Sequence, residues 1–296
     1  MITNHLNLPQ PFVDAVTSDY KPTKGRYSVT RVLGSPCEAV LLRRHGGELD
    51  GDVADYVWAI FGSAVHKILE ESKETEDQIK ENFITVPIDE HYTLSGRFDL
   101  YDDSTGTVID YKTASLWKIK FKNFDDWKKQ TIYYCWMLRQ IGFENARSGQ
   151  IVALIKDHNK REAARDPEYP QHPVFVISWD FSEDDILQAE NEIREWFAQV
   201  AISESLPDSQ LTPCTPEQRW AKSDKWAVKK GKQKRALRVF DSEHDAMMYK
   251  MEHQYPTVES KKLWIEYRKG EDTKCDGYCD VRRWCPYYQA KVDEDF

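Results

Sequence analysis

Hydrophobic residues recur at spacings of three and four along one stretch that follows Asp50-Gly-Asp52. This period is typical of one face of an α-helix, and it predicts a helix that runs to about Lys73 and buries the apolar stripe. The stripe consists of Val53, Val57, Ile60, Phe61, Ala64, Val65, Ile68 and Leu69. Gly62, His66 and Glu70 lie four residues apart at its edge, so the missing side chain of Gly62 leaves room beside His66. On its own, a histidine in this position is more often structural than a ligand.

Alternating and β-branched runs then predict three strands, over residues 82–88, 92–101 and 107–113. The last two form a hairpin, because residues 102–106 have the composition of a turn and Gly106 can adopt a positive φ. A loop of residues 102–106 places Asp99 directly opposite Asp110. Side chains alternate along a strand, so Lys112 shares the face of Asp110 and lies opposite Arg97.

The remaining patterns complete an α/β fold. Residues 1–49 are expected to form a lead-in, extended over 1–27 and helical from Ser28 to near Gly46-Gly47. A helix from Asn123-Phe-Asp125 to Gly142 should turn Ile132, Cys135, Trp136 and Leu138 inward, and strands are expected over 150–155 and 174–179. A long helix then covers 182–205. Residues 50–205 therefore read as a core with the order helix, three strands, helix, strand, in which a mixed sheet is flanked by helices.

The two facing aspartates are the first candidate for chemistry. Like charges directly opposite each other on a sheet are destabilising by up to about 1 kcal/mol, and a bound cation would reverse that penalty. Carboxylate oxygens suit Mg²⁺ or Mn²⁺, and Lys112 would reach the same pocket. The alternative is that Asp99 and Asp110 lie on a solvated face and never meet.

Charge and composition narrow the function. A net charge of -9 argues against a protein that coats nucleic acid by bulk attraction, but it allows a local basic groove. Lysine-rich runs at 118–129 and 222–238, the second within a predicted hairpin, are interleaved with Trp117, Trp127 and Trp226, which offer stacking faces. Such runs can equally be solvated surface. No apolar segment of 18 residues and no basic-apolar leader occurs, so we expect a cytoplasmic protein without membrane contact and with reduced cysteines.

Three cysteines lie within eleven residues near the end of the chain: Cys275, Cys279 and Cys285. This spacing in a polar context predicts a metal centre in the region 206–296, which we expect to pack on the core together with the basic hairpin. Cys214, in a proline-rich polar loop, is the favoured fourth ligand, and Cys37 is a close second. Cys135 lies on an apolar helix face and is expected in the core. Four thiolates can hold either zinc or a [4Fe-4S] cluster.

Four motifs together resemble a known family. They are Gly62-Ser-Ala-Val-His66-Lys-Ile-Leu-Glu70, Gly96-Arg-Phe-Asp99, Asp110-Tyr-Lys112 and Gln130-Thr-Ile-Tyr-Tyr134. In this order they resemble the PD-(D/E)XK nuclease superfamily, specifically its RecB-like branch, although Phe98 stands where the motif that names the superfamily has proline. With the cysteine block the chain resembles the iron-sulfur subgroup, which includes CRISPR-adaptation nucleases and phage exonuclease-like proteins.

The resemblance implies a restriction-endonuclease-like core and a set of roles. His66, Asp99, Asp110 and the Tyr111 carbonyl would hold Mg²⁺ or Mn²⁺ with help from Glu70, and Lys112 would stabilise charge on the phosphate. Gln130 and Tyr134 would position the DNA strand or Lys112.

The function so implied is a metal-dependent DNA nuclease, an exonuclease on DNA ends or single strands, with a structural [4Fe-4S] cluster. The alternatives are a catalytically silent DNA-binding accessory protein of the same fold and a nuclease in which four cysteines hold zinc. The sequence has no GxxxxGK[ST] phosphate loop, so DNA unwinding would need a partner such as a helicase or recombination protein. The resemblance also implies a bacterial or phage-encoded protein.

Overall fold

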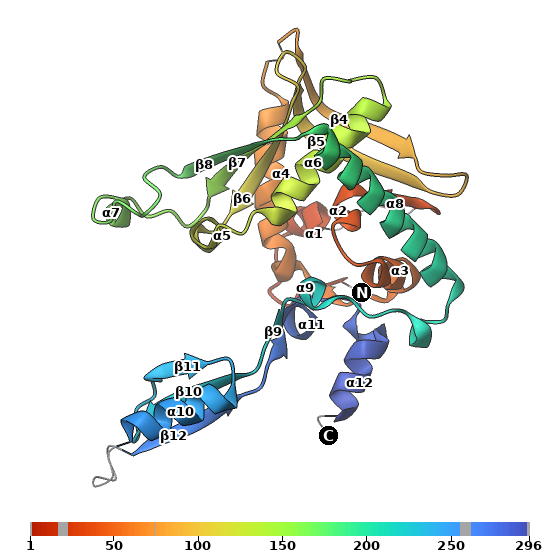
Figure 1. The fold of residues 1–296 in the computed structure, drawn as a ribbon. Helices are drawn as coiled ribbons and strands as arrows, with labels where there is room; N and C mark the ends of the chain where they lie inside the picture. Colours follow the sequence, from red (N-terminus) through yellow and green to blue (C-terminus); the bar gives the residue numbers. More distant parts are fainter. Residues whose placement is uncertain (1, 17–22, 74, 255–261, 295–296) are drawn as a thin grey trace. The chain divides into compact units, whose positions relative to one another are not determined.

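The computed structural model describes residues 2–16, 23–73, 75–254 and 262–294, and it divides into two compact units, Met1–Pro207 and Asp208–Phe296 (Figure 1). Within the described residues, no helix has both the length and the apolar character that a bilayer-spanning segment needs.

The first unit is built on a six-stranded mixed sheet. Its strands are β2 (Arg26–Ser28), β4 (Gln78–Pro87), β5 (Thr93–Asp102), β6 (Thr107–Ala114), β7 (Ser148–Ile155) and β8 (Val174–Asp180). The order is β2-β5-β6-β7-β8, and β4 pairs with β5 as well. The β2–β5 and β6–β7 pairs are parallel, whereas β4–β5, β5–β6 and β7–β8 are antiparallel. The mixed sheet confirms the predicted α/β fold of the core.

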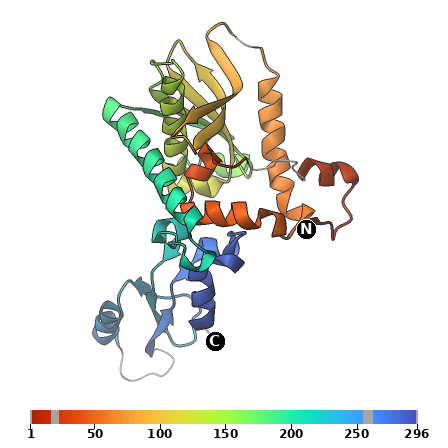
Figure 2. The same ribbon diagram turned by 90° about the vertical axis from the view of Figure 1, so that its right-hand side faces the viewer.

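The first unit contains eight α-helices among its described residues, some of which cover the two faces of this sheet. They are α1 (Gln10–Val16), α2 (Val29–Val32), α3 (Pro36–His45), α4 (Val57–Glu70), α5 (Leu116–Phe121), α6 (Asp125–Gln140), α7 (Lys160–Ala163) and α8 (Glu183–Ser205). Figure 2 shows α6 and α8 on one side of the sheet and α4 on the other. The chain order α4, β4, β5, β6, α6, β7 matches the predicted helix, three strands, helix, strand, with the short α5 added between β6 and α6.

The centre of the core is α6, which is buried from most sides. Ile132, Cys135, Trp136 and Leu138 are all buried, as predicted. The neighbouring Tyr133, Tyr134 and Met137 are buried as well, because the sheet covers one face of the helix and α8 packs against another. A helix enclosed in this way holds its polar side chains in fixed positions, and this matters for Gln130 below.

The expected core stripe of α4 is wrong in part. The helix begins at Val57, after the short strand β3 (Gly51–Asp52) and the 3-10 turn η2 (Val53–Tyr56), and none of its residues, all of which the structure describes, is fully buried. Phe61 and Ile68 are 43% and 69% exposed. The hydrophobic period shows that a helix is amphipathic, but it cannot show whether a second layer covers the apolar face.

Two other segments also differ from expectation. Residues 1–27 are not simply extended, since β1 (Ile2–Thr3) pairs with β3, α1 is helical, and β2 joins the sheet beside β5; residues 17–22 lie outside the described part of the chain. The basic linker after the hairpin contains α5, which forms because Ile119 buries itself against Ala114 and Trp127.

The second unit contains a small three-stranded sheet. Strands β10 (Lys225–Lys230) and β11 (Arg238–Phe240) form the predicted basic hairpin, and β12 (Leu263–Arg268) pairs with the other edge of β10. Helix α10 (Glu243–His253) packs Ala246 against Val228 and Leu263. The shorter elements are β9 (Ala221–Lys222), β13 (Glu271–Asp272), α9 (Pro216–Arg219), α11 (Thr273–Gly277) and α12 (Pro286–Glu294).

Candidate active site

The β5–β6 hairpin has the register that the turn predicts. Leu100 pairs with Ile109 and Asp102 with Thr107, so the next positions in the same register are Asp99 and Asp110. Gly106 adopts a φ of 68°, and a Cβ there would lie 2.1 Å from the carbonyl oxygen of Asn145. The turn therefore requires glycine, and the loop fixes which residues face each other across the strands.

A third carboxylate, missed by sequence reasoning, extends this row. Lys80 pairs with Leu100 and Asn82 with Phe98, so the register of β4 on β5 places Glu81 opposite Asp99. Glu81 has a φ of 44°, a left-handed conformation that side chains other than glycine rarely adopt. Backbone strain of this kind often occurs at functional sites. Glu81 was missed because the predicted strand began at Asn82, four residues after the observed start at Gln78.

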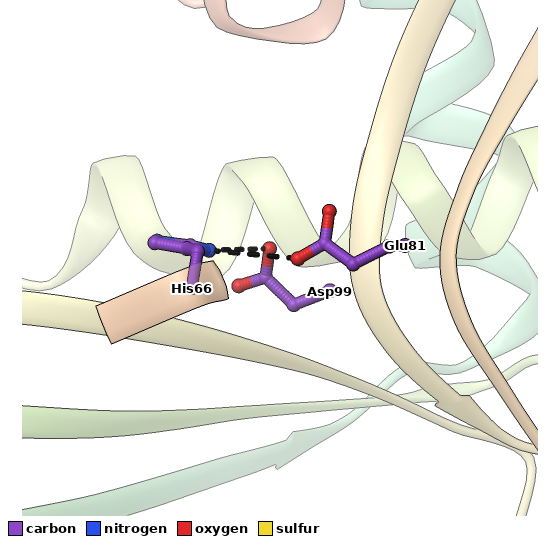
Figure 3. Close-up of side chains that lie close together, drawn as sticks. All are labelled: His66, Glu81 and Asp99. Carbon is purple, nitrogen blue, oxygen red and sulfur yellow. Dashed lines mark hydrogen bonds and ion pairs between the residues drawn. The ribbon is translucent and has the colours of Figure 1, made fainter. Parts of the chain in front are cut away.

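His66 of α4 meets these carboxylates. Its Nδ1 lies 2.9 Å from Asp99 Oδ1 and 3.8 Å from Glu81 Oε1, and one ligand atom from each of the three residues lies within 4.8 Å of the others (Figure 3). The hydrogen bond with Asp99 raises the pKa of His66, although burial opposes this. Burial raises the pKa of Glu81, and the charge of Asp99 adds to the effect. The three side chains therefore form a compact set of one nitrogen and two oxygen ligands.

Asp110 is turned toward Lys112 and Gln130. Its Oδ2 lies 2.7 Å from Lys112 Nζ, and its Oδ1 accepts a hydrogen bond of 3.0 Å from Gln130 Nε2. Asp110 is only 3% exposed, and Oδ2 has no partner with hydrogen-bond geometry among the described residues despite the ion pair. Burial raises the pKa of Asp110 to about 6, with Lys112 opposing and Asp99 reinforcing the shift. The pKa of this buried carboxylate stays raised although Lys112 and Gln130 contact it, so an additional cation bound nearby would stabilise its charged form.

Helix α6 fixes the orientation of Lys112. Lys112 Nζ donates a hydrogen bond of 2.8 Å to Gln130 Oε1, so the Gln130 amide bridges the lysine and Asp110. One turn further along α6, Tyr134 donates a hydrogen bond of 2.8 Å to the carbonyl of Arg97. Tyr134 can approach β5 because Gly96 has no side chain; a Cβ at Gly96 would lie 2.5 Å from the Tyr134 ring. The motif residues of α6 thus bind the strands that carry Asp99 and Asp110.

The other two candidates lie at the edge of this site. The backbone N–H of Tyr111 donates to Asp99 Oδ2 at 2.6 Å, and this contact orients the carboxylate. Glu70 pairs with Lys67 at 3.0 Å instead of joining His66, although its charge contributes to the raised pKa of Glu81. Of the predicted metal ligands, the structure therefore brings together His66 and Asp99, adds Glu81, and places Asp110 beside Lys112.

The donor set of this site fits a divalent cation. Oxygen ligands suit Mg²⁺ and Mn²⁺, and a histidine nitrogen is compatible with Mn²⁺ in particular. Glu81, Asp99 and Asp110 stand in one row across three neighbouring strands. Carboxylates opposed in this way repel one another, and a bound cation would remove the repulsion.

The second unit gathers four of the six cysteines. Burial raises the pKa of the Cys275 thiol to about 12, and the nearby charges of Asp272, Cys279, Cys214 and Cys285 raise it further. Cys214, Cys279 and Cys285 therefore each lie close enough to Cys275 to affect its pKa. The protein alone disfavours the Cys275 thiolate, whereas a positively charged metal centre would stabilise it.

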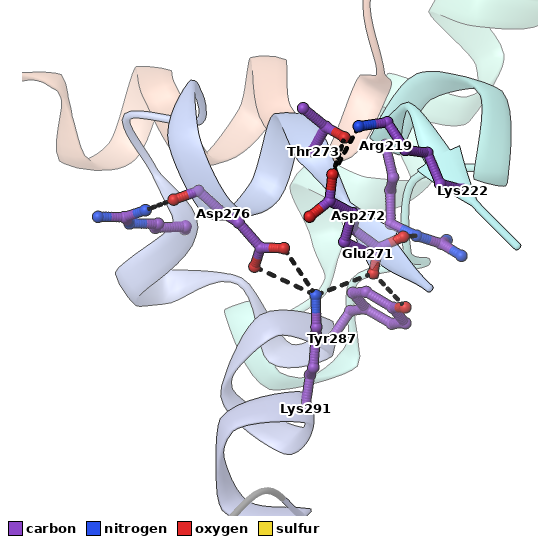
Figure 4. Close-up of polar contacts among 9 residues, drawn as sticks. Arg219, Lys222, Glu271, Asp272, Thr273, Asp276, Tyr287 and Lys291 are labelled. Atoms are coloured by element: carbon purple, nitrogen blue, oxygen red, sulfur yellow. Dashed lines mark hydrogen bonds and ion pairs between the residues drawn. The ribbon is translucent and has the colours of Figure 1, made fainter. Parts of the chain in front are cut away.

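A polar network around Asp272 joins several segments of the second unit (Figure 4). Arg219 donates to the Cys214 carbonyl and also to the buried Asp272, at 3.1 Å. Tyr287 donates to the same carboxylate at 2.8 Å, and Lys291 lies 3.4 Å from it. Asp272 therefore connects the Cys214 loop, the start of α11 and α12.

The two other cysteines belong to the first unit. Cys37 is buried at the start of α3, where its backbone N–H donates to Ser35 Oγ at 3.2 Å. Cys135 is fully buried in α6, as predicted. Burial raises its pKa to about 12, as expected for a thiol that serves packing.

Comparison with known proteins gives one family match. The model of the PD-(D/E)XK nuclease superfamily matches residues 73–286. Structural likenesses include the protein SSO0001, with 16% identity, a TM-score of 0.45, and coverage of 62% of this chain and 79% of that one. An alkaline exonuclease from Laribacter hongkongensis gives 14% identity and a TM-score of 0.37 over 61% and 90% of the two chains. A phage-related exonuclease from Haemophilus somnus 129PT gives 16% identity and a TM-score of 0.27, with coverage of 43% of this chain and 63% of that one. No curated protein gives a significant match.

Proposed function

The chain belongs to the PD-(D/E)XK nuclease superfamily, and we propose that it is a Mg²⁺- or Mn²⁺-dependent DNA exonuclease of the RecB-like branch that carries a [4Fe-4S] cluster. One observation carries the proposal: a row of carboxylates, Glu81, Asp99 and Asp110, stands beside His66 and ends at a lysine held by α6. A protein that merely binds DNA has no need for buried, mutually repelling carboxylates, which would also repel phosphate.

Each residue of the row has a proposed role. His66, Glu81 and Asp99 would hold the cation, and Asp110 would complete the ligand set once its carboxylate turns from Lys112. A bound divalent cation polarises the scissile phosphate and lowers the pKa of the attacking water. The N–H of Tyr111 holds one Asp99 oxygen in place, which leaves the other directed at His66.

Lys112 would stabilise the negative charge that builds up on the phosphoryl oxygens. Its side chain is 24% exposed, so the ammonium group can reach a substrate from the site. Gln130 would keep the ammonium in position while Asp110 changes partner, because its amide oxygen accepts from Lys112 independently of the ion pair.

The cluster proposal rests on the second unit. Cys214, Cys275, Cys279 and Cys285 would be the ligands, because they share one electrostatic neighbourhood and Asp272 ties their segments together. The resemblance to phage exonuclease-like proteins supports DNA ends as the substrate.

The exonuclease assignment is tested with end-labelled linear DNA and closed circular DNA in the presence of Mn²⁺. We expect the linear DNA to be degraded from its ends and the circular DNA to stay intact. Cleavage of the circle would refute the requirement for an end. Binding without cleavage across several divalent metals would assign the protein to the DNA-binding accessory class instead.

The cluster is tested by anaerobic purification with quantitation of iron, sulfide and zinc. The expected product is a brown protein, and Cys214→Ser should lose the iron while Cys37→Ser retains it. A colourless, zinc-loaded protein would refute the cluster, and loss of iron in Cys37→Ser alone would refute the choice of Cys214.

A further inference from the structure

Helix α5 presents two large aromatic side chains to solvent. Trp117 is 61% exposed and Phe121 is 73% exposed, and their rings stack with centroids 5.6 Å apart and planes at 23°. The helix itself is anchored from the other side, where Ile119 is buried in the core. The two rings therefore contribute little to the packing of α5, and exposed aromatic pairs of this kind typically mark an interaction surface.

The surroundings of this pair are basic, although the whole chain is acidic. Residues 111–124 contain four lysines, Lys112, Lys118, Lys120 and Lys122, and no Asp or Glu. Lys120 Nζ lies 5.8 Å from the centre of the Trp117 ring, and Lys120 and Lys122 are exposed. Lys118 is paired with Asp126 at 2.7 Å, so its charge is already compensated.

A third exposed aromatic residue, Trp58, links this surface to the acidic row. Trp58 of α4 is 64% exposed, and Lys156 Nζ lies 4.4 Å above its ring. The backbone N–H of Lys156 donates to the carbonyl of Ala114 at 3.0 Å, just before α5 begins. Trp58 is eight residues from His66 on the same helix, which is about 12 Å along the axis. Between them Gly62 faces β6, where a Cβ would lie 3.8 Å from Thr113 Oγ1.

We propose that Trp117, Phe121 and Trp58, with Lys120, Lys122 and Lys156, form a stacking platform that holds an unpaired strand of DNA beside the active site. This inference rests on the proposed nuclease function for its choice of nucleic acid. Bases of a single strand expose their faces and can stack on aromatic rings while lysines contact the phosphates. In a duplex the internal bases are already stacked on one another, so the platform selects unpaired segments.

The charge favours this occupant over a second copy of the chain. A second copy of the chain could place acidic side chains beside these lysines. Because each copy has a net charge of -9, however, the two copies would also repel each other. Single-stranded DNA supplies both the repeated negative charge that the lysines can contact and the base π-faces that can stack on the exposed rings. Its phosphates would then lead along α4 toward His66.

Binding is measured with the full-length protein carrying Asp110→Asn, so that no probe is cleaved. The probes are 5′-fluorescein-labelled dT12 and a 12-bp blunt duplex, each followed by fluorescence anisotropy at fixed salt. Trp117→Ala combined with Phe121→Ala should weaken dT12 binding about 10- to 100-fold, as loss of one or two stacked bases does, and duplex binding less than about 3-fold. Trp117→Phe should retain most of the affinity. Phe12→Ala, which removes an exposed ring on α1, should change neither.

If the double variant binds dT12 as tightly as the protein that carries Asp110→Asn alone, the platform proposal is refuted. Sedimentation data showing that the unchanged protein is an oligomer which the double variant dissociates would also refute it, because the surface would then be a subunit interface.

Cleavage separates this inference from the proposed function. In the active background, the double variant should raise KM for single-stranded DNA with kcat nearly unchanged. If no form of the protein cleaves DNA but the double variant loses dT12 binding, the nuclease proposal fails and the platform stands. If cleavage is normal and dT12 binding is unaltered, the platform fails and the nuclease proposal stands.

Discussion

Replacing Asp110 by asparagine should stabilise the metal-free protein while it destroys the active site. Asp110 is buried, and its pKa is raised from 3.8 to about 6. At 1.36 kcal/mol per pKa unit, the charged form is disfavoured in the folded state by about 3 kcal/mol. The asparagine side chain would carry no charge and could still accept from Gln130, so we expect a gain of about 1 to 3 kcal/mol in the free energy of unfolding at pH 8.

The sign of the pH dependence follows from the raised pKa. The folded state binds a proton on Asp110 more tightly than the unfolded state does. The contribution of this protonated group to the free energy of unfolding is therefore fully present below the unfolded pKa of about 4, and it is lost as the pH rises through about 6. The advantage of Asp110→Asn over wild type should therefore be near zero at pH 4, grow up to about pH 6, and stay constant above it.

Urea unfolding in the presence of a chelator measures this difference, with tryptophan fluorescence as the signal. Asp184→Asn, which removes an exposed carboxylate from the first turn of α8, is the matched control and should shift the midpoint little. Adding Mn²⁺ at about 100 times its Kd should stabilise wild type by about 2.7 kcal/mol and the Asp110→Asn variant by much less. Equal stability of the two metal-free proteins at pH 8, or a difference independent of pH, would refute the reasoning.

Three further predictions concern the same site. Cleavage with Mn²⁺ should fall as the pH drops from 7 to 5, because Asp110 and His66 both have raised pKa values and both must lose a proton to bind a cation; a flat profile over this range would contradict that requirement. Glu81→Gln should weaken Mn²⁺ binding in calorimetry at least about 10-fold, and an unchanged Kd would show that Glu81 is not a ligand. Gly96→Ala should lower the free energy of unfolding by about 1 to 3 kcal/mol, since its Cβ would lie 2.5 Å from Tyr134; an unaltered urea midpoint would mean that the ring can move aside.

The parts of the site that depend on local chain geometry were predictable. The turn sets which residues of β5 and β6 face each other. Asp102 pairs with Thr107, so the loop spans residues 103–106, and counting outward from this pair gives Asp99 opposite Asp110. Lys112 follows on the same face because strand side chains alternate, and its ion pair with Asp110 confirms this.

Glu81 could have been found by the same counting. The turn before β5 closes with a hydrogen bond of 2.9 Å from the Ile88 N–H to the Tyr92 carbonyl, so its centre is residue 90. Counting outward from residue 90 places position 81 opposite 99, in agreement with the observed register. The signal was lost because residues 78–81 contain only one apolar residue, Ile79, which is too few to show an alternation, so the strand appeared to begin later.

Features that depend on distant parts of the chain were not predictable. The apolar period of α4 shows which residues share one face of the helix. Whether Phe61 on this face is buried depends on which other elements pack beside the helix. The composition of its loop made Cys214 the favoured fourth ligand, but the contacts of Asp272 with Arg219 and Tyr287, which join segments far apart in the sequence, gave no signal.

The central claim is that the carboxylate row beside His66 hydrolyses DNA with the help of a divalent cation. The most direct test incubates end-labelled linear DNA with Mn²⁺ and wild type, Asp110→Asn or Asp184→Asn, after confirming that all three proteins are folded. We predict degradation by wild type and by Asp184→Asn, and none above background by Asp110→Asn. Equal degradation by Asp110→Asn, or degradation by wild type that persists in excess chelator, would contradict the account.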